Sequence, residues 1–399
     1  MKMKIVSLNG VPYGSTGKIA KQINITAENK GYQTLLILGW SKKKRKSDDD
    51  VVATSFFSRL FHLCISKYCG LDGFGSRYKT ECLVKKLREF DPDIIQLHMM
   101  HSGFLHLPTL FKYIKKEKIP VVWTFHDCWA FTGGCTHFES IKCEKWKTGC
   151  KNCQLDSDIR HKIFDSKEFT WMKKKEMVCI NDITVVTPSK WLAEYVKSSI
   201  FKNCFIQVIN NGVDQKVFYP RCSKNRNKSN EYTLLGVAFG WSYKKGLDVF
   251  IELRKRLPNN FKIILVGTDK KIEKQLPSGI QAIRRTSSQE ELAKIYSMAD
   301  VFVNPTREDN FPTVNIEALA CGTPIVTFNT GGSSEIIDET CGLVVEIDDI
   351  DSLEKSIIKL SKSNMFSIEA CVSRAKQFSD TNCYKKYVEL YEEILKDRN

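Results

Sequence analysis

Two carboxylates lie eight residues apart in the second half of the chain, where a strand-like run is followed by a loop and a helix. Asp309 falls in the predicted loop and Glu317 in the predicted helix, in a D-x7-E spacing. A loop and a helix can present carboxylates to different parts of one ligand, while N–H groups at the helix start meet an anion. The segment therefore predicts a binding site for a polar, partly anionic molecule. A solvated acidic pair is the alternative, which the Asn-Phe-Pro turn beside Asp309 disfavours.

The first predicted strand, residues 4–8, leads into a glycine-rich turn. Gly14 and Gly17 lie in this turn, and we expect a helix to begin near Ile19. Such a turn lets backbone N–H groups approach a phosphate or a sugar closely. Lys18 is followed by Ile19 rather than by a metal-binding Ser or Thr, and the spacing does not match G-x-G-x-x-G, so neither a P-loop nor a nicotinamide dinucleotide site is predicted. A tight turn without a ligand is the alternative.

A histidine and an aspartate directly follow the predicted strand at residues 121–125. Ligands of parallel α/β sheets bind at the carboxyl ends of the strands, so we expect His126 to face a binding site. Its ring can donate to a sugar hydroxyl or a phosphate oxygen, and Asp127 can orient that ring or cap the next helix. A structural role for the pair is equally open.

Four of the fifteen cysteines fall within nineteen positions of a polar segment. In a C-x7-C-x6-C-x2-C spacing they are Cys135, Cys143, Cys150 and Cys153. Four thiolates suit a tetrahedral structural zinc site, and the final C-x2-C supplies two ligands from one turn. Buried free thiols and an iron-sulfur cluster are the alternatives. The remaining cysteines are expected to be reduced, because no secretory signal is apparent.

Short β-branched runs alternate with amphipathic segments of helix length, a pattern that predicts parallel sheets covered by helices. Strands are expected in the first half at residues 4–8, 34–38, 94–97, 121–125 and 184–187, and in the second half at 232–238, 262–266, 301–304, 324–328 and 342–345. The fold class is therefore α/β, with two βα domains and a ligand cleft between them.

The length of 399 residues suits two domains, and we place their boundary near residue 210. We expect an N-terminal domain over residues 1–210, a C-terminal domain over 211–378 and a C-terminal helix over 379–399 that returns to the N-terminal domain. The polar stretch at residues 220–231 is expected to be a loop near the junction. Its basic residues are Arg221, Lys224, Arg226 and Lys228.

Positive charge is concentrated in the first half of the chain. Residues 1–210 hold 34 Lys and Arg against 20 Asp and Glu, and residues 211–399 hold 27 against 26, so the net charges are +14 and +1. The densest basic run is residues 42–46, and two further groups are Lys112, Lys115, Lys116 and Lys118, and Lys173, Lys174 and Lys175. Such a surface attracts nucleic acid, an anionic membrane or an anionic substrate. No stretch reaches the roughly 18 apolar residues that a membrane-spanning helix needs.

Together these motifs resemble the retaining, nucleotide-sugar-dependent glycosyltransferases of the large bacterial family 4. That resemblance implies the GT-B fold, with two Rossmann-like domains facing each other across a cleft. It covers most of the chain, and its motifs occur in order: the glycine turn at 14–17, His126, the TPS run at 187–189, the NGVD run at 211–214, Lys245-Gly246 and the D-x7-E segment. The stretch 126–135, with the later cysteines, is similar to the subset that builds surface polysaccharides such as colanic acid and capsule.

The resemblance implies a role for each matching residue. Glu317 is expected to bond the donor ribose, Asp309 the hydroxyls of the donor sugar, and Lys245 the diphosphate. His126, Lys245 and Asp309 are the implied catalytic residues. The other implied donor contacts come from Gly14, Gly17, Trp241, Phe311, Thr313 and Val314, the last three through N–H groups of the backbone.

Two positions depart from the family pattern. Asp309 stands where the family usually has Glu. Phe239 and Gly240 stand where many relatives carry an Arg, so a second cation for the diphosphate is not identified.

The resemblance also implies a UDP- or GDP-sugar donor, no catalytic metal, and a saccharide acceptor linked to a lipid. The implied reaction proceeds with retention, by attack of the acceptor on the face that the leaving diphosphate vacates. We then expect a cytoplasmic protein, peripheral on the cytoplasmic membrane face and attracted to anionic lipid, with no nucleic-acid partner.

Two other functions compete with this prediction. A basic zinc-knuckle protein that binds nucleic acid would explain the charge and the cysteines, but it leaves Asp309 and Glu317 without a role. A glycan phosphorylase or a nucleotide-sugar hydrolase on the same fold is the nearer rival, and analysis of products with an acceptor present separates these reactions.

Overall fold

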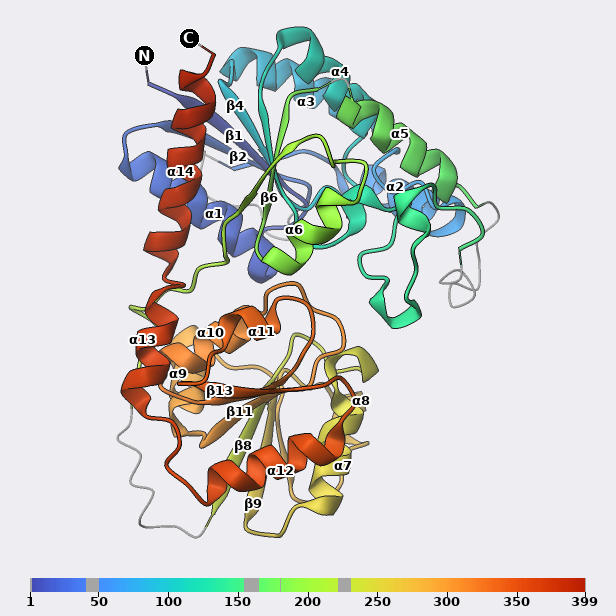
Figure 1. Ribbon diagram of the computed structural model, residues 1–399. Coiled ribbons are helices and arrows are strands. Elements are labelled where there is room, and N and C mark those ends of the chain that lie inside the picture. The colour runs from blue at the N-terminus through green and yellow to red at the C-terminus, as the bar shows by residue number, and fades with distance from the viewer. Residues whose placement is uncertain (1, 41–49, 154–164, 180, 222–230, 399) are drawn as a thin grey trace. The chain divides into compact units, whose positions relative to one another are not determined.

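The computed structural model describes residues 2–40, 50–153, 165–179, 181–221 and 231–398. The chain forms two compact units (Figure 1): unit 1 consists of Met1–Ile209 and Tyr384–Asn399, and unit 2 of Asn210–Cys383. The basic run expected at residues 42–46 lies outside the described residues, as do Lys224, Arg226 and Lys228 of the expected junction loop.

Within its described residues, unit 1 contains a seven-stranded parallel sheet in the order β3-β2-β1-β4-β5-β6-β7. Its strands are β1 (Lys4–Asn9), β2 (Gln33–Leu38), β3 (Asp50–Val52), β4 (Ile94–Leu97), β5 (Val121–Thr124), β6 (Ile183–Thr187) and β7 (Phe205–Val208). All residues of β4, β5 and β6 are buried, as expected for parallel strands covered on both faces.

Helices separate these strands and cover the sheet (Figure 1). They are α1 (Gly14–Asn29), α2 (Phe56–Cys69), α3 (Arg77–Phe90), α4 (Leu107–Glu117), α5 (Lys167–Cys179) and α6 (Lys190–Lys197), with the 3-10 helices η1 (Trp129–Phe131), η2 (Glu139–Ile141) and η3 (Lys145–Lys147). None of the described helices in either unit is long and apolar enough to cross a membrane.

The last helix, α14 (Asp380–Lys396), joins unit 1 through its C-terminal part. The Tyr391 hydroxyl donates to Gln96 Oε1 of β4 at 2.8 Å, and Thr124 Oγ1 of β5 donates to the Tyr387 hydroxyl at 3.1 Å. These buried bonds anchor the chain terminus to the centre of the unit 1 sheet, although Tyr391 is almost 300 residues from Gln96 in sequence.

Unit 2 has the same architecture, with a six-stranded parallel sheet in the order β10-β9-β8-β11-β12-β13 among its described residues. Its strands are β8 (Tyr232–Val237), β9 (Phe261–Val266), β10 (Ile280–Ile283), β11 (Val301–Asn304), β12 (Ile325–Phe328) and β13 (Gly342–Val345). Its helices are η5 (Tyr243–Lys245), α7 (Leu247–Arg256), α8 (Lys270–Glu273), α9 (Gln289–Met298), α10 (Thr313–Ala320), α11 (Ser333–Ile336), α12 (Ile350–Ser361) and α13 (Ile368–Lys376).

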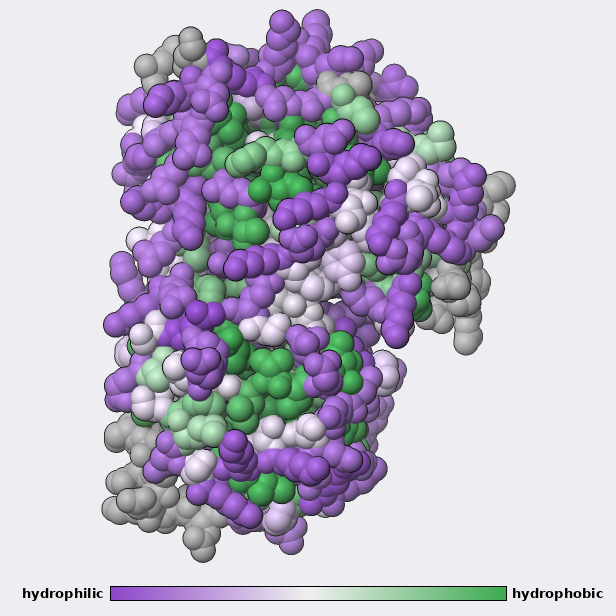
Figure 2. Space-filling model, in the orientation of Figure 1, coloured by the Kyte–Doolittle hydropathy of each residue, from purple (hydrophilic) through white to green (hydrophobic). Residues whose placement is uncertain are grey.

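Both sheets therefore follow the strand order of a dinucleotide-binding fold, in which the chain starts at the centre, moves to one edge and then crosses to the other side. The expected α/β class with two βα domains is confirmed. Hydrophilic side chains cover much of the surface drawn in Figure 2, and hydrophobic areas are visible on both units. Each unit also contains a large cluster of buried hydrophobic residues.

Candidate active site

The strand order of unit 2 puts the point where the sheet changes direction between β8 and β11. Loops that follow two such strands diverge to opposite faces, which leaves a crevice at their carboxyl ends where ligands of open α/β sheets bind. The loop after β8 carries Lys245, and the loop after β11 carries Asp309. The two residues that the sequence singles out for diphosphate and sugar therefore follow the carboxyl ends of these two neighbouring strands.

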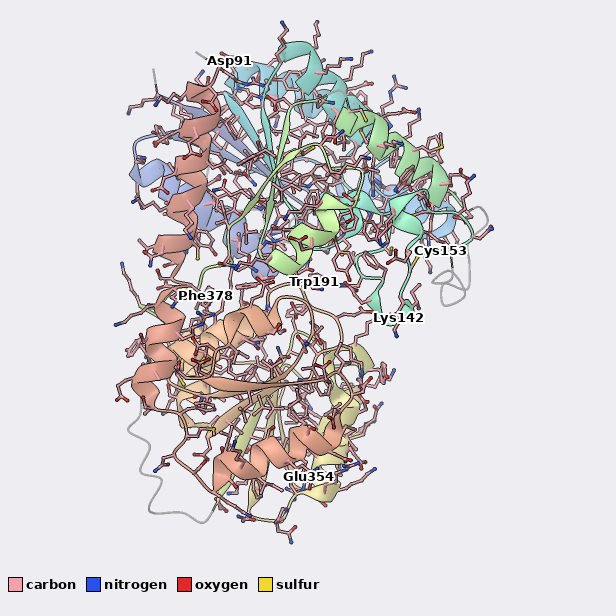
Figure 3. The ribbon with its side chains drawn as sticks, viewed as in Figure 1. Asp91, Lys142, Cys153, Trp191, Glu354 and Phe378 are labelled. Atoms are coloured by element: carbon pink, nitrogen blue, oxygen red, sulfur yellow. The ribbon has the colours of Figure 1, made fainter. Side chains whose placement is uncertain are left out.

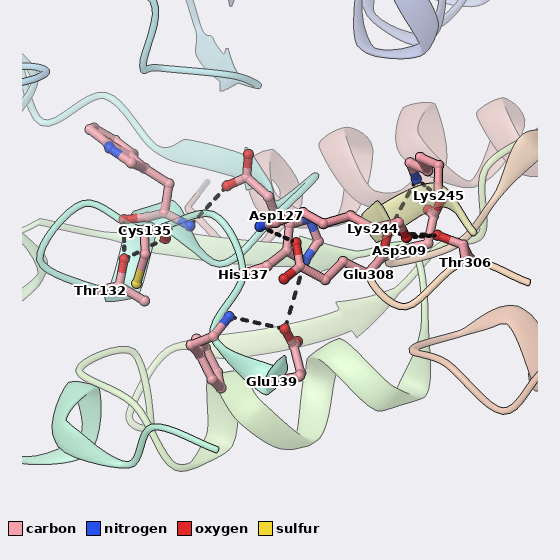
Figure 4. Close-up of polar contacts among 12 residues, drawn as sticks. Asp127, Thr132, Cys135, His137, Glu139, Lys244, Lys245, Thr306, Glu308 and Asp309 are labelled. Carbon is pink, nitrogen blue, oxygen red and sulfur yellow. Dashed lines mark hydrogen bonds and ion pairs between the residues drawn. The ribbon is translucent and has the colours of Figure 1, made fainter. Parts of the chain in front are cut away.

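Lys245 contacts the loop after β11 directly (Figure 4). Its Nζ lies 2.8 Å from Asp309 Oδ2 and donates to the Glu308 carbonyl oxygen at 3.2 Å. The exposed fractions of the two side chains are 35% for Lys245 and 24% for Asp309, so both remain accessible to a ligand. Gly246 follows with a φ of +73°, and a Cβ there would lie 2.4 Å from the Pro305 carbonyl oxygen. The glycine thus permits the close approach of the two loops.

The neighbouring Lys244 makes a different ion pair. Its Nζ lies 2.7 Å from Glu308 Oε2 (Figure 4), and the Glu308 side chain is only 5% exposed. Arg307 fixes the same turn, because its N–H donates to the Lys244 carbonyl oxygen and its guanidinium bonds Asp248 and lies 3.8 Å from the centre of the Tyr243 ring. Sequence analysis did not identify this use of Arg307, which joins the turn of Lys244 and Lys245 to the loop after β11.

The first turn of α10 follows Asp309 closely. Pro312 is the N-cap, and no side chain caps this helix end, so the N–H groups of Thr313 and Val314 start the helix without a capping side chain. Phe311 is buried, and its carbonyl oxygen accepts from Asn211 Nδ2 at 3.0 Å. An uncapped helix start beside a lysine favours an anionic group.

Glu317 lies one turn further along α10 and is held by a buried tyrosine. The Tyr296 hydroxyl of α9 donates to Glu317 Oε2 at 3.1 Å. Burial raises the pKa of Tyr296 well above its usual value, and the Glu317 carboxylate raises it further, so the hydroxyl stays a donor. This bond orients Glu317, which is partly exposed, and the pairing could not be found from the sequence because the two residues lie on different helices.

Trp241, a predicted donor contact, has a core position in the structure. Its side chain is 7% exposed, its indole N–H donates to the Val266 carbonyl oxygen at 3.0 Å, and its ring packs edge-on against Phe250. A donor contact from Trp241 is therefore restricted to its backbone.

In unit 1, the glycine-rich turn lies between β1 and α1 at the equivalent change of direction, between β1 and β4. The expected start of the helix near Ile19 is wrong, because α1 begins at Gly14, which has a φ of +77°. Gly17 is in the first turn of α1, and a Cβ there would lie 2.6 Å from the Pro12 carbonyl carbon. A larger residue at position 17 would clash with the backbone of the preceding turn. Packing alone therefore requires Gly17, independently of any ligand.

His126 lies just after β5 and pairs with a second histidine. Its Nε2 is 3.1 Å from Nδ1 of the buried His98, which follows β4, and the two rings stack at 5.4 Å. Burial lowers the pKa of His126 to about 4 and that of His98 well below its usual value, so both rings are neutral near pH 7. His98, which sequence analysis missed, restricts the orientation of His126.

The Asp127 carboxylate bonds the His101 ring and a backbone N–H group. Its Oδ1 accepts from the N–H of Trp129, the first residue of η1, at 2.8 Å, and its Oδ2 accepts from His101 Nε2 at 2.8 Å. Burial alone would raise the pKa of Asp127, but the His101 ring holds it below its usual value. Asp127 therefore holds the His101 ring and the start of η1, while Cys128 is the N-cap of η1.

The expectation that Lys173, Lys174 and Lys175 share one basic surface is wrong for Lys174. This side chain is buried, donates to the carbonyl oxygens of Trp129 and Thr132 at 2.6 and 3.1 Å, and lies 3.4 Å from the centre of the Trp129 ring. Burial lowers the pKa of Lys174 to about 7. Lys174 instead supports the segment that follows His126.

The four predicted zinc ligands lie in the segment after η1, residues 132–153, which we call the cysteine loop. Lys142 and Cys153 mark parts of it in Figure 3. All four line one cavity of about 20 Å³, and the Gly133 N–H donates to Cys150 Sγ at 3.1 Å. Burial raises the pKa of Cys150 to about 12. No group of three or more His, Cys, Asp or Glu side chains in the described part of the chain is placed to hold a metal ion, so zinc binding stays a prediction.

Comparisons with known proteins extend over both units. Residues 232–363 match the sequence profile of "Glycosyl transferases group 1", and residues 68–217 match that of "Glycosyltransferase Family 4". A curated protein of Escherichia coli named for colanic acid biosynthesis, the glycosyl transferase WcaC, is 21% identical over 370 residues, which are 88% of this chain and 87% of WcaC. The UDP-Gal:α-D-GlcNAc-diphosphoundecaprenol α-1,3-galactosyltransferase of Escherichia coli is 26% identical over 200 residues, 45% of this chain and 51% of that enzyme.

Solved structures match almost the whole chain. Sucrose-phosphate synthase from Thermosynechococcus elongatus has a TM-score of 0.73 at 16% identity and covers 99% of this chain and 100% of its own. Anabaena HepE in complex with UDP-glucose has a TM-score of 0.67 at 13% identity, with coverage of 99% and 100%. At these identities the likeness establishes the fold, and the expected GT-B fold is confirmed.

Proposed function

We propose that the chain, which belongs to glycosyltransferase family 4 among enzymes of polysaccharide biosynthesis, transfers a sugar from a nucleoside diphosphate to a lipid-linked saccharide. In the proposed reaction the sugar keeps its anomeric configuration. The observation that carries the proposal is the Lys245–Asp309 contact of 2.8 Å beside the start of α10. A cation, a carboxylate and uncapped N–H groups within one crevice match a diphosphate attached to a sugar.

We assign the donor contacts along this crevice in order. Lys245 and the N–H groups of Thr313 and Val314 take the diphosphate, Asp309 takes sugar hydroxyls, and Glu317, oriented by Tyr296, takes the ribose. Support for the donor class also comes from Anabaena HepE, whose structure holds UDP-glucose. UDP- and GDP-sugars are the donors that we propose to test first.

Departure of the diphosphate is the step that this arrangement would assist. It leaves an oxocarbenium-like sugar and a nucleoside diphosphate that carries one more negative charge than it had in the donor, and preorganised positive charge and N–H dipoles stabilise that charge as it develops. We propose that the acceptor hydroxyl attacks from the vacated face and gives its proton to the departing phosphate. No catalytic metal is required in this scheme, since Lys245 and the start of α10 supply the positive potential.

His126 and the glycine turn are the contributions that we assign to unit 1. Because burial keeps His126 neutral near pH 7, its ring can exchange hydrogen bonds with a sugar hydroxyl without adding charge. We propose that Gly14 and Gly17 form the part of the site nearest the donor phosphates. The acceptor class agrees with the relative that uses a diphosphoundecaprenol-linked sugar, and we place the reaction at the cytoplasmic face of a membrane.

Product analysis tests this function. The purified protein is incubated with a ¹³C-labelled nucleotide sugar and a lipid-linked saccharide, and the new linkage is examined by NMR, with Asp309→Asn as the matched inactive control. We expect a glycoside with the anomeric configuration of the donor. Free sugar as the sole product would indicate a hydrolase, a sugar phosphate formed with inorganic phosphate would indicate a phosphorylase, and an inverted glycoside would contradict retention.

A further inference from the structure

Helix α2 exposes its apolar side chains and buries a histidine. The exposed fractions are 80% for Phe57, 66% for Phe61, 59% for Phe56 and 50% for Leu60. His62 is the buried residue of this helix, with 0% exposed. An amphipathic helix that packs on a soluble core shows the opposite arrangement.

The exposed apolar residues form one continuous face. At 3.6 residues per turn, these residues all fall within an arc of about 140° around the helix axis. They are Phe56, Phe57, Leu60, Phe61, Cys64 and Tyr68, and we call this surface the α2 face. His62 points to nearly the opposite direction on the same helix.

The orientation of α2 is fixed by its contacts to the rest of unit 1. His62 Nε2 lies 3.3 Å from both the Gly73 and the Gly75 N–H groups, and its Nδ1 is 2.9 Å from Ser76 Oγ. A Cβ at Gly75 would lie 2.7 Å from the His62 ring, so the chain there passes directly over the ring. Rotation of α2 to bury its aromatic side chains would break all of these contacts.

Both ends of α2 are also defined. Ser55 caps the N-terminus by accepting from the Ser58 N–H, and Gly70 closes the C-terminus with a φ of +67°. The helix is thus a complete element with an outward apolar face, and contiguous apolar surface of this kind on a soluble unit marks an interaction site.

We propose that the α2 face lies in the interfacial region of an anionic lipid bilayer. The charged residues of α2 are Arg59 and Lys67, and the helix has no acidic residue. Lys67 is exposed in the last turn of α2, at the C-terminal end of the face, where its stem can lie along the apolar groups while its ammonium reaches lipid phosphates. The net charge of +14 on residues 1–210 adds attraction to such a surface.

Charge also argues against a second copy of this chain as the occupant. A symmetric dimer through the α2 face would place Lys67 of both copies at the interface with no acidic residue of α2 to pair with it, whereas anionic lipid neutralises this charge. Binding of the α2 face to a bilayer rests on the proposed function in one respect: a lipid-linked acceptor would be presented at the same bilayer.

Vesicle co-sedimentation tests the inference with the full-length protein. The vesicles contain either phosphatidylcholine alone or phosphatidylcholine with phosphatidylglycerol, at low and high salt. The variants are Phe57→Asp, Leu60→Gln and the matched control Phe205→Asp, since Phe205 is 64% exposed on the edge strand β7 of the same unit. Leu60→Gln keeps the test decisive if an introduced charge prevents folding.

We expect binding to the anionic vesicles that weakens with salt and is at least about tenfold weaker for Phe57→Asp, with a smaller loss for Leu60→Gln and no loss for Phe205→Asp. Equal binding by all folded variants, equal binding to neutral vesicles, or no vesicle binding would overturn the inference. A dimer of the wild-type protein that Phe57→Asp dissociates, seen by light scattering, would also overturn it. Nucleotide-sugar binding measured on the same samples tests the proposed function separately, because the donor residues lie in unit 2.

Discussion

Replacing Lys245 by methionine separates catalysis from folding more cleanly than other changes at the site. The Nζ of Lys245 lies 2.8 Å from Asp309 Oδ2, and the two side chains are 35% and 24% exposed. Methionine keeps most of the apolar length of the lysine side chain and removes its charge. We expect Lys245→Met to fold and to lose turnover.

The size of each effect follows from this geometry. A hydrogen bond to a charged group contributes about 1.5 to 3 kcal/mol, so loss of the bond to the leaving diphosphate should lower kcat/KM by about 10- to 150-fold. A partly exposed ion pair contributes less than about 1 kcal/mol to stability, which corresponds to less than about 4 °C in Tm for a domain of this size.

Lys244→Met is the matched control, because Lys244 is adjacent in sequence but pairs with the buried Glu308. Loss of Lys244 leaves that buried carboxylate without its cation, so this variant should lower Tm more than Lys245→Met while it keeps kcat/KM within about threefold of wild type. The assay combines steady-state kinetics over donor concentration with thermal unfolding of each variant. Wild-type kcat/KM in a folded Lys245→Met protein, or equal loss in both variants, would refute the reasoning.

Four further outcomes are expected. Asp309→Asn should weaken binding of the nucleotide sugar by at least about tenfold, measured by calorimetry, while the affinity for free nucleoside diphosphate stays within about threefold of the wild-type value. An equal loss of affinity for both ligands would contradict a contact between Asp309 and the sugar. Tyr296→Phe should raise the donor KM about fivefold with kcat unchanged, since it only loosens Glu317, and an unchanged KM would argue against this orienting role. Folding stability should fall as the pH drops from 6.5 toward 4, because the pKa of His126 is about 4 in the folded protein and the unfolded chain binds the proton first. In thermal melts, Tm should therefore depend less steeply on pH for His126→Gln than for wild type. An identical dependence of Tm on pH in the two proteins would speak against a buried neutral ring. Protein purified without a metal-affinity tag should contain about one zinc that Cys150→Ser removes, whereas less than about a tenth of an equivalent, with four reactive thiols, would exclude a zinc site in the cysteine loop.

The central strands could be predicted from the sequence, whereas of the edge strands in the described sheets only β13 was predicted. Three strands were missed, namely β3, β7 and β10, and each lies at an edge of its sheet. An edge strand pairs on one side and is only partly covered, so its sequence lacks a continuous apolar run; Phe205 of β7, for example, is exposed. Strands β4, β5 and β6 are buried throughout and produce the β-branched runs that were recognised.

The residues that we propose for the donor site were selected from motifs, whereas their partners in the fold could not be predicted. Lys245 and Asp309 are far apart in sequence and meet because β8 and β11 are neighbours in the sheet. The bond from Tyr296 to Glu317 depends on how α9 packs on α10, which no local pattern reveals. Lys174 looked like part of a basic surface because composition alone does not distinguish a buried lysine that bonds carbonyl oxygens from an exposed one.

The central claim is that unit 2 binds a nucleoside diphosphate sugar, and a thermal-shift screen against UDP, GDP, ADP and their sugars tests it most directly. At 100 times its dissociation constant a ligand stabilises the folded state by about 2.7 kcal/mol, or about 5 to 11 °C for a domain of this size. We predict a shift of this size for one nucleotide class, larger for its sugar than for the bare diphosphate, and reduced in Lys245→Met. No shift with any nucleotide sugar, or the same shift in Lys245→Met as in wild type, would contradict the account.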